Sequence, residues 1–443
     1  MPDAQPQPVD DGVDANFIAH IKQAVSRAMP DAARIFDELR HASADGRGVT
    51  RQAFGAGEQA AAGIIAAEAK KLDLEVDHDH AGNLYATLPG KDRSLPAVVL
   101  GSHLDSVPVG GNYDGAAGVV AGIAVTSALR TLGLSPAQDI RVMGIRGEES
   151  VWFGTAYLGS SLALGLLPLE RLEKLTRSDT GETLGAHIDA LGYDTAKLRG
   201  SPPYLSAENV AAYYELHIEQ GPILQERDLP VAIATVIRGN ARYPFAHCEG
   251  THAHSAAVPR AFRRDAVLAT ADLVMRLEDF WQEIEAAGST ESVLTVGEFF
   301  TDPGAHGMTT VPGRVTFTLN FGTTRSADIE EFHRRVLTAA RDIEAYRRVK
   351  FDLGPTTGTP PRQLDTNIRA GLSAACRSLG HEALEMATAG HDASMFAKAG
   401  VPSGMVLVRN ANGSHNPDEA MEMEDFAEGC RVLLTALALR RSI

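Results

Sequence analysis

Short apolar runs that end at polar or glycine-rich turns recur along the chain, and amphipathic stretches lie between them. Residues 97–103, 140–145, 210–218 and 404–408 have the length and the apolar character of strands buried on both faces. Residues 58–71 and 117–132 are predicted helices. Buried strands that alternate with helices predict an α/β core, in which helices flank a mostly parallel sheet.

The pattern changes between residues 238 and 355, where the order strand, helix, strand, strand, helix, strand is predicted. The helix at 328–346 begins with acidic residues and is followed by Arg347 and Arg348, as the helix dipole favours. The helix at 264–287 has one apolar stripe, formed by Val267, Ala271, Val274, Leu277, Trp281 and Ile284. We therefore expect a smaller α+β domain at 238–355, with a four-stranded antiparallel sheet and two helices, inserted between the two parts of the main domain at 1–237 and 356–443.

Length and composition limit the classes of protein that remain. A chain of 443 residues favours two domains. A net charge of -16 without a basic cluster argues against a nucleic-acid partner, and no apolar run reaches the ~20 residues that span a membrane. Residues 1–12 lack a secretory signal and are predicted to be a disordered tail. The three cysteines are far apart, which predicts neither a disulfide framework nor a zinc ribbon. We expect a cytoplasmic protein.

Five potential metal ligands follow the predicted strands. His103 and Asp114 lie at the two ends of a glycine-rich turn after the first strand, and Glu149 follows the second. His217 lies near the end of the third strand, and His415 lies in the loop after the last. Because the carboxyl ends of parallel strands meet at one edge of a sheet, we expect the five side chains to converge there. Each is weak evidence alone, and their convergence is the stronger argument.

Three imidazoles and two carboxylates suit a pair of divalent ions such as zinc, manganese, cobalt or nickel, bridged by one carboxylate. We assign Asp114 as the bridge, His103 and His217 to one ion, and Glu149 and His415 to the other. Glu148 then remains as general base for the metal-activated water. Asp105, two residues after His103, is expected to hold the imidazole of His103 in one tautomer. A phosphate-binding loop or a serine nucleophile is disfavoured, because the chain contains neither Gly-x-Gly-x-x-Gly nor Gly-x-Ser-x-Gly.

Longer motifs surround these residues, among them Arg146-Gly-Glu-Glu149, Glu215-Leu-His-Ile-Glu-Gln-Gly-Pro222, Gly390-His-Asp-Ala393 and Ser414-His-Asn-Pro417. On these motifs nearly the whole chain resembles the dinuclear-metal amidases of hydantoinase/carbamoylase type. That family includes N-carbamoyl-L-amino-acid hydrolases, allantoate amidohydrolases and beta-ureidopropionases. The motif around His217 is the most distinctive, because related di-zinc peptidases commonly have Asp or Glu as the ligand at that position.

The resemblance implies an amidohydrolase that cleaves a ureido (N-carbamoyl) or related linear amide bond. It implies that Gln220, His254 and His391 face the substrate, and we count Asn240 among the expected substrate-binding residues. In relatives the equivalent of His254 comes from the smaller domain, often that of the partner subunit, and stabilises the oxyanion. A homodimer through this lid domain is therefore expected.

Two positions depart from the family pattern. The Asn and Arg that usually clamp the substrate carboxylate correspond to Thr309 and Gly322, and a glycine cannot make the two-pronged contact of an arginine. We therefore expect altered specificity, for a substrate that lacks the free carboxylate or carries a larger apolar group. Arg260, Arg314 and Arg325 are candidates for a relocated anchor. Two alternatives stay open: an N-acyl amino acid acylase or dipeptidase on the same metals, and a non-catalytic metal-binding relative.

Overall fold

The computed structural model describes residues 14–440, so the predicted tail at 1–12 lies outside the described residues. The chain divides into two compact units. The larger unit comprises Met1–Thr235 and Gln363–Ile443, as far as these ranges are described, and the smaller unit comprises Val236–Arg362. Each unit has its own hydrophobic core.

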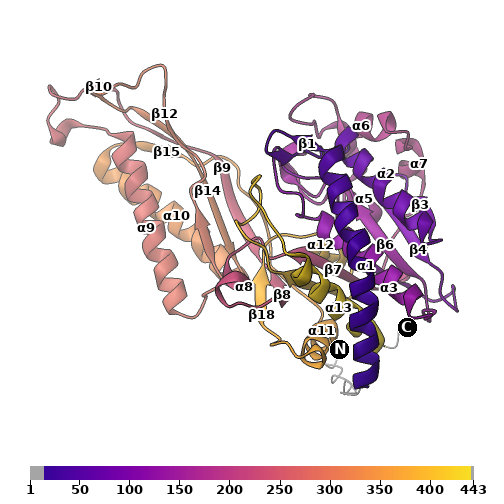
Figure 1. Cartoon of the computed structure of the whole chain (residues 1–443). Helices are drawn as coiled ribbons and strands as arrows, with labels where there is room; N and C mark the ends of the chain where they lie inside the picture. Colours follow the sequence, from indigo (N-terminus) through magenta and orange to yellow (C-terminus); the bar gives the residue numbers. More distant parts are fainter. Residues whose placement is uncertain (1–13, 441–443) are drawn as a thin grey trace. The chain divides into compact units, whose positions relative to one another are not determined.

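A nine-stranded mixed sheet forms the centre of the larger unit (Figure 1). Its strands follow the order β17-β8-β19-β7-β5-β6-β4-β3, with β18 beside β8. Neighbouring strands among β19, β7, β5 and β6 pair in parallel, whereas β8 pairs antiparallel with β19, β4 with β6, and β3 with β4. The prediction of a mostly parallel sheet is therefore corrected to a mixed sheet. The bounds are β3 Glu75–His78, β4 Leu84–Leu88, β5 Ala97–His103, β6 Ile140–Ile145, β7 Val210–Ile218, β8 Val231–Ile237, β17 Arg362–Gln363, β18 Glu385–Thr388 and β19 Ser403–Val408.

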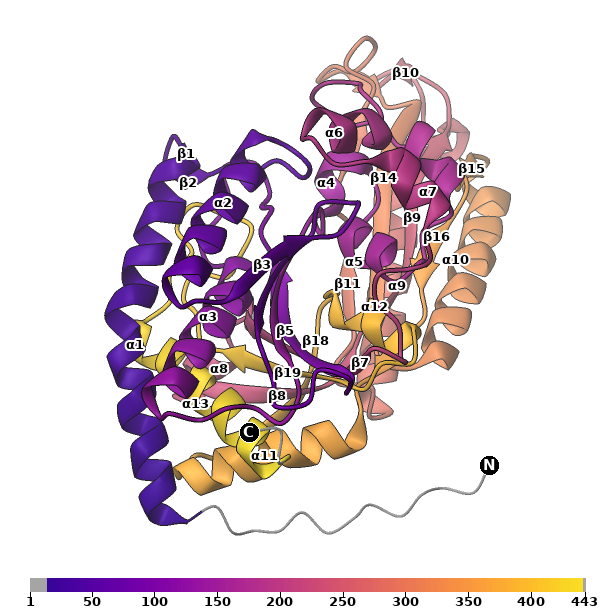
Figure 2. The same ribbon diagram turned by 90° about the vertical axis from the view of Figure 1, so that its right-hand side faces the viewer.

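Helices cover both faces of this sheet, which explains why β5 and β19 are buried along their whole length. Figure 2 shows α3 and α1 on one side of β5, and α5 and α12 on the other. The long first helix, α1, was not predicted. The helices of this unit are α1 Ala15–Ala42, α2 Ala56–Lys71, α3 Ala116–Thr131, α4 Ser150–Phe153, α5 Leu158–Ala163, η1 Leu169–Glu173, α6 Leu184–Ala190, α7 Thr195–Gly200, α8 Ile223–Glu226, α11 Thr366–Leu379, α12 Ala393–Lys398 and α13 Met423–Leu439. A separate hairpin pairs β1 Ala44–Asp45 with β2 Gly48–Val49.

The smaller unit is an antiparallel sheet with two long helices, α9 and α10. The sheet has six described strands instead of the predicted four, because β11 and β12 are separate short strands and β16 adds to β9. Phe332 of α10 stacks on Phe321 of β14 with ring centroids 4.6 Å apart, in the core between helices and sheet. The bounds are β9 Gly239–Glu249, β10 Ala253–His254, η2 Arg260–Phe262, α9 Ala266–Ala286, β11 Val293–Thr295, β12 Phe299–Thr301, β13 Thr310–Val311, β14 Arg314–Thr323, α10 Ser326–Arg347, β15 Lys350–Asp352 and β16 Thr357–Thr359.

None of the helices within residues 14–440 is both long enough and apolar enough to cross a membrane. Cys248, Cys376 and Cys430 are free and buried.

Candidate active site

Neighbouring parallel strands bring His103 and His217 to one edge of the sheet. Leu100 of β5 pairs with Tyr214 of β7, and each histidine lies three residues further along its own strand. Asp114 lies in the turn between β5 and α3, Glu149 follows β6, and His415 follows β19. The structure therefore brings together the five side chains that the sequence analysis expected to converge, as two groups of candidate ligands that share Asp114.

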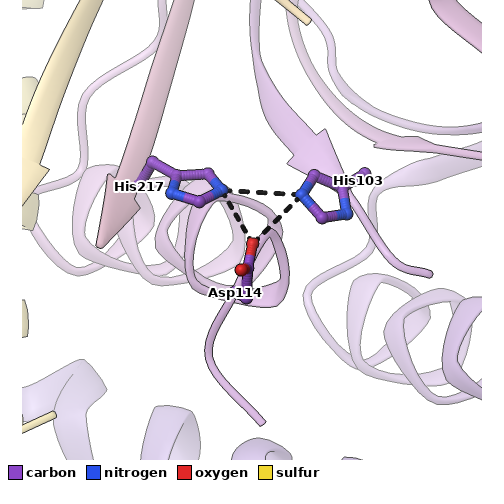
Figure 3. Close-up of side chains that lie close together, drawn as sticks. All are labelled: His103, Asp114 and His217. Carbon is purple, nitrogen blue, oxygen red and sulfur yellow. Dashed lines mark hydrogen bonds and ion pairs between the residues drawn. The ribbon is translucent and has the colours of Figure 1, made fainter. Parts of the chain in front are cut away.

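The first group consists of His103, Asp114 and His217, whose side chains point toward one another in Figure 3. The Oδ1 atom of Asp114 lies 3.4 Å from Nε2 of His103 and 3.2 Å from Nε2 of His217. The two Nε2 atoms are 3.5 Å apart. All three side chains are at most 5% exposed, so solvent is nearly excluded from this group.

The hydrogen bonds of both imidazoles leave their Nε2 lone pairs turned toward Asp114. His103 Nδ1 lies 3.1 Å from the carbonyl oxygen of Asp105, and His217 Nδ1 lies 2.9 Å from the carbonyl oxygen of Ile218, so each Nδ1 carries the donated proton. The backbone N–H of Gly115 also donates to Nε2 of His217, at 3.2 Å. In these tautomers, lone pairs converge on a carboxylate oxygen, which is an arrangement suited to a cation.

The second group consists of Asp114, Glu149 and His415. His415 Nε2 lies 3.5 Å from Oδ2 of Asp114 and 3.2 Å from Oε1 of Glu149. The two oxygens of Asp114 therefore face different groups, which is the arrangement expected of a bridging carboxylate. The imidazole of His415 is 53% exposed, so this group is open to solvent on one side.

The electrostatics of both groups favour positive charge. Burial by itself lowers the pKa of His103, but its contacts with Asp105 and Asp114 outweigh burial and raise that pKa well above its usual value. The hydrogen bond to Glu149 raises the pKa of His415 to about 9. Burial raises the pKa of Asp114, yet its contacts with His103 and His217 hold it well below the ordinary range.

Glu148 and Asp105 lie beside the first group. Burial raises the pKa of the Glu148 carboxyl well above its usual value, and although His103 lowers it, the neighbouring Glu149 raises it further. Asp105 was predicted to orient His103, and its Oδ1 lies 3.4 Å from His103 Nδ1. Its two carboxylate oxygens also accept the backbone N–H groups of Glu148 and Glu149, at 2.9 and 3.0 Å. Asp105 thus contacts both the imidazole and the turn that carries the two glutamates.

Gln220 has a positive φ of 65° and donates its side-chain amide to Oδ2 of Asp114, at 2.9 Å. Two residues that the sequence analysis missed contact Asp114. Ser414 contacts Oδ2 of Asp114, and buried Glu419 accepts the N–H groups of Tyr113 and Asp114 at 2.8 and 3.2 Å. Both flank His415 in a single loop, and this closeness in sequence is the signal that could have found them.

His391, predicted to face the substrate, is 1% exposed. Its ring centroid lies 4.3 Å from that of His217, and its Nε2 lies 2.9 Å from the hydroxyl of Thr388. His391 therefore packs directly against one candidate ligand.

The other predicted site residues, His254, Asn240, Thr309 and Gly322, belong to the smaller unit. The Nδ1 atom of His254 accepts the N–H groups of Ala256 and Ala257, each at 3.2 Å, which assigns the ring proton to Nε2. Thr309 is exposed, and its carbonyl accepts the N–H of Ser255 at 2.8 Å. His254 thus carries its ring N–H at Nε2, and its side chain is exposed.

Asn240 and Gly322 are direct cross-strand partners on β9 and β14. The next pair on the same face is Arg242 with Asn320, in which Arg242 Nε donates to the side-chain oxygen of Asn320 at 3.2 Å. Ala241 and Phe321 point to the opposite, core face. Arg242 therefore lies diagonal to Gly322, and the sequence analysis did not consider it.

Comparison with known proteins gives consistent similarities. Residues 99–439 match the family described as Peptidase family M20/M25/M40. The N-carbamoyl-L-amino acid amidohydrolase of Geobacillus stearothermophilus is 33% identical over 390 residues, which cover 87% of this chain and 92% of that protein. The ureidoglycolate hydrolase of Oryza sativa subsp. japonica is 30% identical over 375 residues, covering 83% of this chain and 75% of that protein. A crystal structure of a hydantoinase/carbamoylase family amidase from Burkholderia multivorans has a TM-score of 0.83 at 28% identity, covering 94% of this chain and 98% of that chain. These similarities confirm the resemblance drawn from the sequence motifs.

Proposed function

Because the chain belongs to the peptidase family M20/M25/M40 and its relatives are amidohydrolases, it is a hydrolase of C–N bonds in linear amides, and we propose that it cleaves a ureido (N-carbamoyl) or closely related bond. One observation carries the proposal. Asp114 presents Oδ1 to His103 and His217 and Oδ2 to His415, whose Nε2 also lies 3.2 Å from Glu149 Oε1.

The donor atoms of the site fit divalent metal ions. Among the described residues, Asp114 Oδ1 is buried without a hydrogen-bond partner, although it lies between two imidazole nitrogens. Converging lone pairs of this kind suit a cation, and mixed imidazole and carboxylate donors suit zinc, manganese, cobalt or nickel. We propose two ions, with His103 and His217 at one, Glu149 and His415 at the other, and Asp114 bridging them. Such ions, when bound, lower the pKa of a coordinated water and polarise the scissile carbonyl.

We propose Glu148 as the general base. It lies next in sequence to Glu149 but outside both candidate ligand groups, so its carboxylate is left to accept a proton from the attacking water. Burial and the neighbouring Glu149 raise its pKa, and a raised pKa makes the carboxylate a stronger base. The same carboxyl would then return the proton to the leaving nitrogen.

His254 is the proposed oxyanion donor, and the smaller unit is the proposed lid and dimerisation domain. With Nδ1 engaged by two backbone N–H groups, the Nε2 proton can be donated to the developing negative charge of the tetrahedral intermediate. We propose a homodimer through this domain, for which the predicted bounds are 238–355 and the compact unit spans Val236–Arg362. Gln220 and His391 are proposed to contact the substrate from the larger unit.

Specificity is proposed to differ from that of ordinary carbamoyl amino acids, because Thr309 and Gly322 offer no carboxylate clamp. Arg242 supports a second possibility. It is two residues from Asn240 on the same strand face, and diagonal to Gly322, so it is a further candidate for a relocated anchor. If Arg242 has this role, the enzyme should still accept substrates with a free carboxylate.

The general-base assignment is tested with Glu148→Gln. This variant should keep its metal content and lose turnover, because the amide cannot accept the proton. Glu149→Gln is the matched control at the next position, and it should lose metal as well as activity. An active Glu148→Gln enzyme would overturn the assignment. The wild type is assayed in parallel, and a wild type that binds metal but shows no turnover would favour the non-catalytic metal-binding alternative.

The substrate class is tested with a panel of N-carbamoyl-L-amino acids, neutral ureides, N-acyl amino acids and dipeptides. Ureido cleavage releases ammonia and carbon dioxide, whereas an acylase releases a carboxylic acid. Equal turnover of carbamoyl amino acids and neutral ureides contradicts the altered-clamp argument. Repeating the panel with Arg242→Met shows whether KM rises for the carboxylate substrates alone, as a relocated anchor requires.

A further inference from the structure

The turn that carries the two glutamates of the site is held by side chains from distant parts of the larger unit. We propose that Glu58 is a positioning residue that, together with Asn83, sets the conformation of this turn, residues 146–149. The proposal rests on the roles proposed above for Glu148 and Glu149. It concerns buried groups that contribute no atom to either candidate ligand group.

Four consecutive backbone N–H groups of the turn donate to side chains. Arg146 N donates to Asn83 Oδ1 at 3.0 Å, and Gly147 N donates to Glu58 Oε1 at 2.8 Å. The N–H groups of Glu148 and Glu149 donate to the two oxygens of Asp105. The turn lies between the end of β6 at Ile145 and the start of α4 at Ser150. Side chains therefore provide the hydrogen bonds that a helix or strand would otherwise provide.

The conformation of Gly147 directs its N–H toward Glu58. Its φ is +62°, which an L side chain rarely adopts, and a Cβ there would lie 2.6 Å from the ring of Phe54. Phe54 is itself tied to Glu58, because its backbone N–H donates to Glu58 Oε2 at 2.8 Å. Glu58 thus connects the start of α2 to Gly147 of the turn.

Arg146 balances the buried charge of Glu58. The Nη1 atom of Arg146 lies 2.7 Å from Oε2 of Glu58, and neither side chain is more than 1% exposed. Arg146 Nε donates to the carbonyl of Gly82 at 2.6 Å, next to Asn83 in the sequence. A buried ion pair often stabilises a fold no better than an apolar pair of similar volume. An apolar pair, however, cannot accept the N–H of Gly147, so positioning accounts for this pair better than stability does.

Asn83 is oriented by its own partners. Its side-chain amide donates to Asp79 Oδ2 at 2.7 Å and to the carbonyl of Gly159 at 3.0 Å, so Oδ1 must face Arg146 N. The space between Asn83 Oδ1 and Gly159 is too small for a side chain at Gly159, since a Cβ there would lie 2.4 Å from Asn83 Oδ1. Asn83 and Glu58 therefore accept adjacent N–H groups of the turn from two separate segments of the chain. A turn fixed in this way holds the side chains that it carries, Glu148 and Glu149, in a defined position.

The test compares Glu58→Gln and Asn83→Ala with Glu68→Gln. Glu68 is a matched control because it lies on the same helix, is 5% exposed and pairs with Arg34 at 2.7 Å, while its described partners are Arg34 and Lys71. Hydrogen exchange of metal-free protein is followed by mass spectrometry for peptides that cover residues 146–149. Steady-state kinetics of the metal-loaded enzyme give kcat and KM.

We expect Glu58→Gln and Asn83→Ala to accelerate exchange at residues 146–149 by about tenfold or more, with exchange elsewhere unchanged. We expect kcat to fall by about 10- to 100-fold while KM changes by less than about threefold, because misplacing a catalytic group affects the reacting state most. Glu68→Gln should change neither local exchange nor kcat.

Unchanged exchange at the turn in a folded Glu58→Gln protein overturns the proposal, and so does a uniform rise in exchange over the whole larger unit. If Glu58→Gln does not fold, Asn83→Ala carries the same two readouts, since it removes one turn contact and no charge. If the wild type cleaves no ureide or amide, the proposed function fails, but the exchange measurement still decides whether Glu58 and Asn83 hold the turn.

Discussion

Replacement of Gly115 by alanine tests whether the imidazole of His103 is held in place by close packing. Gly115 follows Asp114 directly and caps α3 with a φ of +67°. A methyl group at this position would lie 2.4 Å from Cε1 of His103, whereas ordinary contact begins at 3.4 Å. The ring would therefore have to retreat by about 1 Å.

The expected cost has two parts. The φ of +67° and ψ of -51° at Gly115 form a sparsely populated combination that costs an alanine about 1–3 kcal/mol. Forcing the methyl against the packed ring adds about 1–3 kcal/mol, as overpacking of a core does. Gly133 is a control for the positive φ without the packing, because its φ is also +67° and a Cβ there meets nothing within 4 Å. Gly133→Ala should therefore lose only about 1–2 kcal/mol, against about 2–6 kcal/mol for Gly115→Ala.

Urea unfolding of the metal-free wild type and both variants measures these free energies, and calorimetric titration with a divalent ion measures affinity. Gly115→Ala should bind the ion about 10- to 100-fold more weakly, because its ligand is displaced, while Gly133→Ala should bind normally. Turnover of Gly115→Ala should fall by about 100-fold, as a displacement of this size can cause.

Equal losses of unfolding free energy in the two variants would refute the packing argument. Normal ion affinity in a folded Gly115→Ala protein would refute the assignment of His103 as a ligand held by this contact.

Three further predictions concern the metals, the thiols and the smaller unit. Chelation should abolish activity and lower the melting temperature, and an ion at 100 times its Kd should restore about 2.7 kcal/mol of stability; a melting temperature indifferent to both treatments contradicts the site. Burial raises the pKa of Cys248 and Cys376 to about 12, so the protonated thiols should resist a disulfide reagent at pH ~8 until urea unfolds the protein, and rapid labelling of the folded protein would count against their burial. Phe332→Ala removes the ring stacked on Phe321 and should cost about 3–5 kcal/mol in urea unfolding, whereas a loss below ~1 kcal/mol would mean that this core is not packed as described.

Local patterns in the sequence were sufficient for the elements that build the site. The apolar runs at 140–145 and 210–218 coincide with β6 and β7, and the helix predicted at 117–132 is α3 to within one residue. Continuous apolar character is a strong local signal for strands buried on both faces. The convergence of His103, Asp114, Glu149, His217 and His415 follows from such strands, because parallel strands end at a common edge.

The outer strands depended on tertiary packing. β3 is four residues long with an alternating exposed and half-buried pattern, and such a segment becomes a strand only by pairing with β4. The same holds for the smaller sheet, where β11 and β12 are two separate strands that both pair with β14. Their pairing is a property of the partner strand as much as of their own residues.

The contacts around the candidate ligands depended on the fold most of all. Glu58 is separated from Arg146 by 88 residues, and Gln220 from Asp114 by 106. A hydrogen bond between such distant residues has no periodicity and no fixed spacing, so no pattern in the sequence predicts it. Hydrophobic periodicity thus predicts which segments are buried, while only the folded chain brings a given donor within reach of its acceptor.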